Sequence, residues 1–168
     1  MATVEVNKQT KLSEHFTLGE LTKTKHKTAD GNIPSHEVIE NLKRMCDWLE
    51  ELRYSYNTLY CLQPGEDYET SANVEGIIIN SGYRSTAVNK LAGGVATSNH
   101  LTGCAVDIRC VGKEQMIRYA AILLDIADGT KQDYDELIFE LRGNTCWLHF
   151  AVRPPSKQNR RRIGFIKV

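Results

Sequence analysis

Two segments repeat apolar residues at the spacing of an α-helix. From Ser35 to Tyr54, apolar positions recur every three or four residues, which places them on one helical face. These positions are Val38, Leu42, Met45, Leu49 and Leu52. Pro34 and Ser35 supply the preceding break and the N-cap. Residues 113–127 show the same period, and the Asp128-Gly129 pair predicts where that second core helix ends.

A strand pattern begins in the middle of the chain. The β-branched run within Glu75–Ser81 predicts a buried strand. Ser85 can cap a short helix that runs through Leu91. Residues Ala105–Cys110 alternate, which turns Val106, Ile108 and Cys110 toward the core and Asp107 to the opposite face. We expect that opposite face to stay available for chemistry.

The C-terminal third predicts a hairpin and an edge strand. Leu137–Leu141 and Cys146–Val152 flank the four-residue loop Arg142–Thr145, and Ile163–Val168 is a further apolar run. The expected fold class is therefore α+β, with a small antiparallel sheet packed against helices. We expect one domain over residues 1–168, in which residues 1–34 form an N-terminal arm packed on the rest.

Composition and charge narrow the function classes. The chain has 168 residues, 21 Lys+Arg and 21 Asp+Glu, a net charge of zero and a pI near 7.0. This balance argues against a nucleic-acid-binding domain, which usually carries a strongly basic face. No stretch is long and apolar enough for a membrane span, and the first residues lack the pattern of a secretory signal. We expect a monomer that is synthesised in the cytoplasm.

Two of the five histidines stand in strand-like contexts with candidate partners. His100 precedes the strand that carries Asp107, and His149 alternates with the core residues Leu148 and Phe150. If these strands are neighbours, two imidazoles and one carboxylate converge and leave an open position, as a catalytic zinc requires. From the residues alone, a core histidine hydrogen-bonded to aspartate is equally consistent with this pattern.

The motifs around these residues resemble a known family, that of the zinc D-Ala-D-Ala carboxypeptidases and L-alanyl-D-glutamate endopeptidases, including phage and prophage members and hedgehog-like relatives. The resemblance extends from about residue 12 to residue 152. Its main motifs are Ser98-x-His100-x-x-Gly103-x-Ala105-x-Asp107, Trp147-x-His149, Ser81-Gly82-Tyr83-Arg84-Ser85, and the arm segment Phe16–Leu21.

The resemblance implies a zinc peptidase that cleaves peptidoglycan stem peptides. His100, Asp107 and His149 would hold Zn²⁺, and Arg84 would bind a carboxylate of the stem peptide. Ser98 is a further substrate-binding candidate, or it caps its own loop. Tyr83 is a candidate for either substrate binding or packing. The resemblance also suggests a phage lysin, which would reach the cell wall through a membrane opened by another protein.

The general base is where this sequence departs from its relatives. Several of them have a glutamate three residues before the last histidine, and here that position is Cys146. In the expected hairpin Leu141 pairs with Cys146, so Glu140 lies opposite Trp147 and shares a face with His149. We therefore predict Glu140 as the catalytic base, with Glu136 as the fallback.

Other interpretations follow from the same residues. A non-catalytic zinc module, or a virion structural protein of the same fold, would keep the metal site without the reaction. Two histidines and a carboxylate also form the iron site of some oxygenases. We interpret Cys104, Cys110 and Cys146 as buried thiols rather than ligands. The basic segment Lys157–Arg162 is expected to be a solvated turn.

Overall fold

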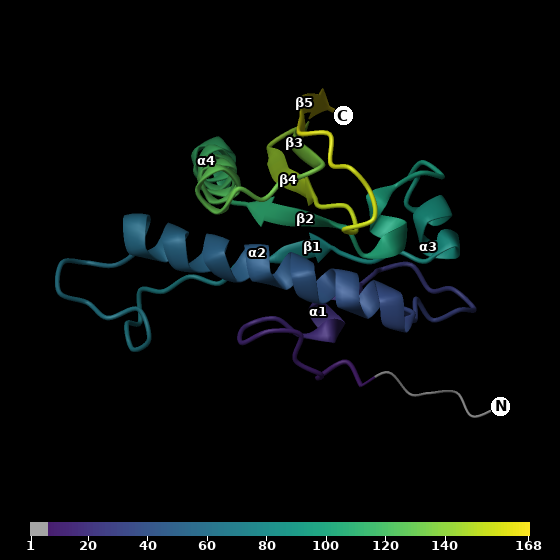
Figure 1. Ribbon diagram of the computed structural model, residues 1–168, viewed down its shortest axis with the longest axis horizontal. Helices are drawn as coiled ribbons and strands as arrows, with labels where there is room; N and C mark the ends of the chain where they lie inside the picture. The colour runs from purple at the N-terminus through teal and green to yellow at the C-terminus, as the bar shows by residue number, and fades with distance from the viewer. Residues whose placement is uncertain (1–6) are drawn as a thin grey trace.

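The computed structural model describes residues 7–168, in which helices pack against one five-stranded sheet (Figure 1). The expected arm began at residue 1, so its first six residues lie outside the described part. The helices are α1 (Leu18–Thr22), α2 (His36–Tyr60), α3 (Thr86–Leu91) and α4 (Gly112–Thr130), with a 3-10 turn, η1, at Asn99–Thr102. The strands are β1 (Ile79–Ser81), β2 (Ala105–Cys110), β3 (Glu136–Arg142), β4 (Thr145–Ala151) and β5 (Arg162–Lys167).

The sheet is mixed, and its strand order is β1-β2-β4-β3-β5. The first four strands pair antiparallel as expected, whereas β5 pairs parallel to β3. The direction of β5 follows from where the chain returns to the sheet. Ala151 at the end of β4 and Arg162 at the start of β5 both pair with Glu136, so residues 152–161 stay at one end of the sheet. The α+β class is confirmed, with this one parallel edge.

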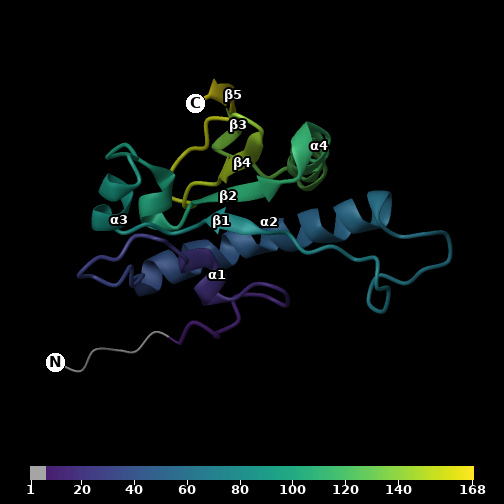
Figure 2. The same cartoon turned by 180° about the vertical axis from the view of Figure 1, so that it is seen from behind.

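The core lies between the sheet and the two long helices. Alternate residues of β2, β3 and β4 face it, as the sequence pattern predicted, and Trp48 of α2 packs on Phe150 of β4 with ring centroids 5.2 Å apart. In both views α2 runs below the strands (Figures 1 and 2), and α1 contacts both this side of the core and β1. Within the described residues, no helix is long and apolar enough to cross a membrane.

Several element boundaries differ from the sequence prediction. The expected four-residue hairpin loop was wrong, because Arg142 and Thr145 pair with each other. Helix α2 continues beyond Tyr54 to Tyr60, because Asn57 is buried and its amide donates to the Glu75 carbonyl. Helix α4 runs through Asp128-Gly129 and ends before Lys131, which takes the left-handed conformation at φ 56°. Strand β1 is only three residues long, because pairing with β2 begins at Ile79.

The N-terminal arm packs on the domain and touches the segment after β1. Phe16, Leu18 and Leu21 are buried, whereas Ile33 is 49% exposed. A capping box between Thr17 and Glu20 begins α1. The Tyr83 amide donates to the Leu21 carbonyl at 2.7 Å. The arm is therefore fixed directly against the segment that leads to Arg84.

Candidate metal centre and cleft

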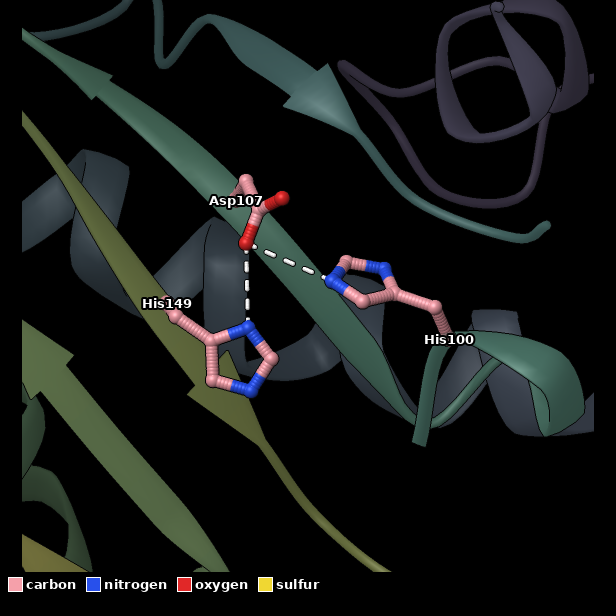
Figure 3. A group of neighbouring side chains, drawn as sticks. All are labelled: His100, Asp107 and His149. Carbon is pink, nitrogen blue, oxygen red and sulfur yellow. Dashed lines mark hydrogen bonds and ion pairs between the residues drawn. The ribbon is translucent and has the colours of Figure 1, made fainter. Parts of the chain in front are cut away.

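The three predicted ligands come from one turn and two paired strands. Ser98 accepts a hydrogen bond from the His100 amide and begins η1, and Gly103 ends that turn at φ 71°. A side chain at Gly103 would come within 2.9 Å of the Val38 carbonyl, so glycine permits the close packing of η1 on α2. In the sheet register Asp107 lies directly opposite His149. The three side chains therefore point at one another (Figure 3).

The ligand atoms are close enough to share one ion. Nε2 of His100 lies 3.3 Å from Oδ1 of Asp107, and Nδ1 of His149 lies 3.0 Å from the same oxygen. One candidate atom from each residue lies within 4.8 Å of the other two. Two imidazole nitrogens and one carboxylate oxygen are a donor set that zinc accepts, with a fourth position left for water or substrate. The residues present thus fit a catalytic metal.

In both histidines the ring nitrogen that points away from the cluster, called the outer nitrogen below, also has a hydrogen-bond partner. Nδ1 of His100 lies 2.6 Å from the Gly82 carbonyl, and Nε2 of His149 lies 3.1 Å from Oε2 of Glu136. An acceptor at the outer nitrogen favours the tautomer with its proton there, which leaves the inner nitrogen free to bind metal. Both histidines are therefore oriented as metal ligands usually are.

The cluster favours an ionised Asp107 and a protonated His149. Burial alone would raise the pKa of Asp107, but His100 and His149 together hold that pKa far below its usual range. Burial likewise opposes protonation of His149, yet the hydrogen bonds that it donates to Asp107 and Glu136 raise its pKa to about 9. Without a cation in the cluster, the carboxylates hold a proton on His149, and a metal ion would take the place of that charge.

The polar face of β2 is less open than the sequence pattern suggested. Ala105 is fully buried and Asp107 only 7% exposed. Arg84 covers Asp107: its Nη2 lies 2.8 Å from Oδ2, while its Nε donates to the Ser81 hydroxyl. The loop after β1 and η1 both pack over this part of the strand, but Asp107 still lines a cleft. On the same face Arg109 is exposed.

That cleft has a volume of about 680 Å³ and collects most of the predicted site. Its lining includes all three candidate ligands together with Arg84, Ser98, Glu140 and Trp147. Ser98 caps η1 and also lines the cleft, so its capping role is observed and substrate binding by it stays a prediction. Tyr83 is buried at 9% exposure and does not line this cleft, which gives its side chain a packing position.

The two candidate bases occupy different positions. Glu140 pairs with Trp147, as the expected hairpin register required, and lines the cleft. Burial and the negative charge of Asp107 raise its pKa. Glu136 is absent from the cleft lining and accepts from His149, and this hydrogen bond lowers its pKa. The position of Glu136 therefore suits an orienting acceptor, and that of Glu140 suits a proton acceptor.

A network behind Glu136 was not found from the sequence. The Asp135 carboxylate is fully buried and accepts from Arg160 and Asn99. Arg160 also reaches Glu136 at 3.1 Å. Arg160 is exposed, as expected for a solvated turn, but its ion pairs with Asp135 and Glu136 were not predicted. The neighbouring acids Asp135 and Glu136 were the one sequence feature that pointed to this network. Their partner Arg160 lies at least 24 residues away in sequence.

The cysteines take no part in the cluster. Cys104, Cys110 and Cys146 are buried free thiols, as predicted, and burial raises the pKa of Cys110 to about 12. The thiolate form needed for metal binding is correspondingly disfavoured.

An α+β domain with an open His-Asp-His cluster in a cleft fits the class of metal-dependent hydrolases. A family model described as Peptidase M15 matches residues 66–134. Over this segment, which is less than half of the chain, the sequence is similar to the M15 peptidases. The matched region contains Arg84, His100 and Asp107 and ends before His149, which the fold supplies. No curated protein matches the sequence significantly.

Proposed function

We propose that this protein is a zinc-dependent peptidase that hydrolyses bonds in the stem peptide of bacterial peptidoglycan. The observation that carries the proposal is that the His-Asp-His cluster, Glu140 and Arg84 all face one cleft. A metal cluster with a purely structural role would need neither a half-buried carboxylate nor a guanidinium beside its open side.

The chain's own groups divide the work of hydrolysis. A zinc ion at the cluster would polarise the scissile carbonyl and acidify the attacking water. Glu140 accepts the proton from that water and passes it to the leaving amine. Its raised pKa brings the carboxylate closer to the range in which it can both accept and donate a proton near neutral pH.

Arg84 has a double role in this proposal. Two of its donors hold Ser81 and Asp107, which fixes the guanidinium at the cleft edge. Its remaining N–H groups are directed to a carboxylate of the stem peptide, such as that of D-Glu or the terminal D-Ala. Arg84 thus links the position of the substrate to the position of a metal ligand.

The site of action is part of the proposal. We infer that the protein acts as a monomeric phage or prophage lysin, which is made in the cytoplasm and reaches the wall through a membrane opened by another protein. The resemblance to phage-borne members of the family supports this placement.

Digestion of purified peptidoglycan, followed by mass spectrometry of the released peptides, tests the function. We expect new amino termini without cleavage of sugars, activity lost on chelation and restored by zinc, and zinc as the metal in anaerobically purified protein. Loss of one alanine would identify a carboxypeptidase, and a split after the first alanine an endopeptidase. Zinc binding without any peptide release would contradict the proposal and favour a non-catalytic or virion structural module. Iron in place of zinc would contradict it as well.

A further inference from the structure

A second cavity adjoins the metal cleft and is lined by basic residues. It has a volume of about 530 Å³ and shares Lys25, Asn80, Arg84 and Ala92 with the cleft. Lys23, Thr24 and His26 of the arm also line it. No acidic side chain lines it. The metal cleft therefore continues into a space whose charged groups are all cationic.

The loop that carries these cations is fixed in place. Leu21 at its start accepts from the Tyr83 amide, and Asn32 at its end donates to the Tyr83 carbonyl and accepts from the Ser85 amide. Asn32 is buried and takes the left-handed conformation at φ 53°. The loop passes beneath α3 in both views (Figures 1 and 2). The loop is thus fixed at both ends, and its Lys23 and Lys25 line the same cavity as Arg84.

The charges of these lysines are not used within the protein. Among the described residues, neither Lys23 nor Lys25 forms an ion pair, although the whole chain is electrically neutral. Asp30, the one acid between Lys23 and Asn32, directs its carboxylate to Thr28 and to the Asn32 amide. Arg84, in contrast, already gives donors to Asp107 and Ser81. Arg142, another cation of the cleft lining, lies over the Trp147 ring. Lys23 and Lys25 are therefore the loop cations that can meet a further anionic group.

We propose that Lys23 and Lys25 form an anionic subsite that binds a second carboxylate of the substrate, in addition to the one held by Arg84. The inference rests on the proposed function, because it concerns the same cleft. It narrows the substrate class to acidic peptides that carry at least two free carboxylates. The lysines act on binding and leave the reacting groups untouched.

Isothermal titration of zinc-loaded protein tests this subsite. The probe is the stem pentapeptide with free carboxylates on D-Glu and on the terminal D-Ala, compared with the same peptide amidated at both positions. The protein carries Glu140→Gln so that the peptide stays intact. Lys23→Ala/Lys25→Ala should weaken binding of the acidic peptide roughly 10-fold and leave binding of the amidated peptide unchanged.

Lys27→Ala is the matched control, because Lys27 lies in the same exposed loop and lines neither cavity. Equal weakening by Lys27→Ala, equal weakening for the amidated peptide, or no weakening at all would overturn the subsite. Failure of the proposed function can be distinguished from failure of the subsite. Lysine-dependent binding of the acidic peptide without hydrolysis by the unmodified protein contradicts the peptidase, whereas hydrolysis without lysine dependence contradicts only the subsite.

Discussion

Nε2 of His149 lies 3.1 Å from Oε2 of Glu136, on the side of the ring opposite Asp107. Nδ1 of the same imidazole faces Asp107 at 3.0 Å. One histidine therefore connects a carboxylate in the metal cluster with a carboxylate behind it. Since a hydrogen bond at the outer nitrogen orients the ring and increases its basicity, Glu136 should set how well His149 binds metal.

Replacing Glu136 should therefore weaken metal binding before it changes chemistry. Glu136→Ala is expected to lower zinc affinity by roughly 10- to 100-fold, because His149 loses its outer acceptor. Glu136→Gln keeps an oxygen that can accept, so its loss should be smaller. Competition titration with a chelating dye measures both, with the exposed Glu69→Ala as control. Equal zinc affinity in Glu136→Ala and the unmodified protein would contradict this role.

Glu140 should show the opposite pattern. Glu140→Gln is expected to retain zinc but to lose about 10²- to 10⁴-fold in turnover, the usual contribution of a general base. Because the pKa of Glu140 is raised, activity should fall as pH decreases through a value above the ordinary 4.5, where the carboxylate becomes protonated. The pH profile of kcat/KM measures this acidic limb. Full activity of the zinc-loaded variant would remove Glu140 from the reaction.

The sequence allowed the register of the hairpin to be predicted, because alternation is a local signal. The pairing of Glu140 with Trp147 and the position of His149 followed from this register. The expected four-residue loop was wrong, since Arg142 and Thr145 pair with each other and only Gly143 and Asn144 form the turn. The contact of Arg160 with Asp135 could not be inferred in this way, since it joins residues 25 apart through a loop without a repeating pattern. The burial of Asp107 on β2 could not be predicted either, because it results from the tertiary packing of η1 and Arg84 over this residue.

Gly82 should be intolerant of any side chain. A Cβ there would lie 2.2 Å from the Leu21 carbonyl oxygen, so the arm must shift away from the segment after β1. The Gly82 carbonyl also accepts from His100, and the shift should therefore reach the metal cluster. Gly82→Ala is expected to lower both the melting temperature and zinc affinity. Thermal unfolding and zinc titration measure the two effects.

Gly76→Ala provides the comparison, because a Cβ at Gly76 meets nothing within 4 Å. Loss of stability of the same size in both variants would indicate a general cost of removing glycine. That outcome would contradict the specific contact between the arm and the site.

The Arg160 guanidinium should stabilise the fold through the buried carboxylate of Asp135. Its Nε and Nη2 lie 3.0 and 2.7 Å from the two oxygens of that carboxylate. Arg160→Ala leaves Asp135 with Arg153 and Asn99, and we expect a loss of about 2 kcal/mol in the free energy of unfolding at pH 7. Urea denaturation measures it. Arg162→Ala is the matched control, since Arg162 is exposed and lies 3.5 Å from Glu136.

The difference in the free energy of unfolding between the unmodified protein and Arg160→Ala should decrease at acidic pH. Burial opposes ionisation of Asp135, but hydrogen bonds from Arg160 and Asn99 hold its pKa below 3.8. A depressed pKa in the folded state contributes stability that is fully present above the unfolded pKa and is lost as pH falls through the folded value. The gap between the unmodified protein and Arg160→Ala should therefore be constant from pH 7 to about 5 and narrow below about 4. A gap that stays constant to pH 3 would assign the effect of Arg160 to packing of its stem rather than to the ion pair.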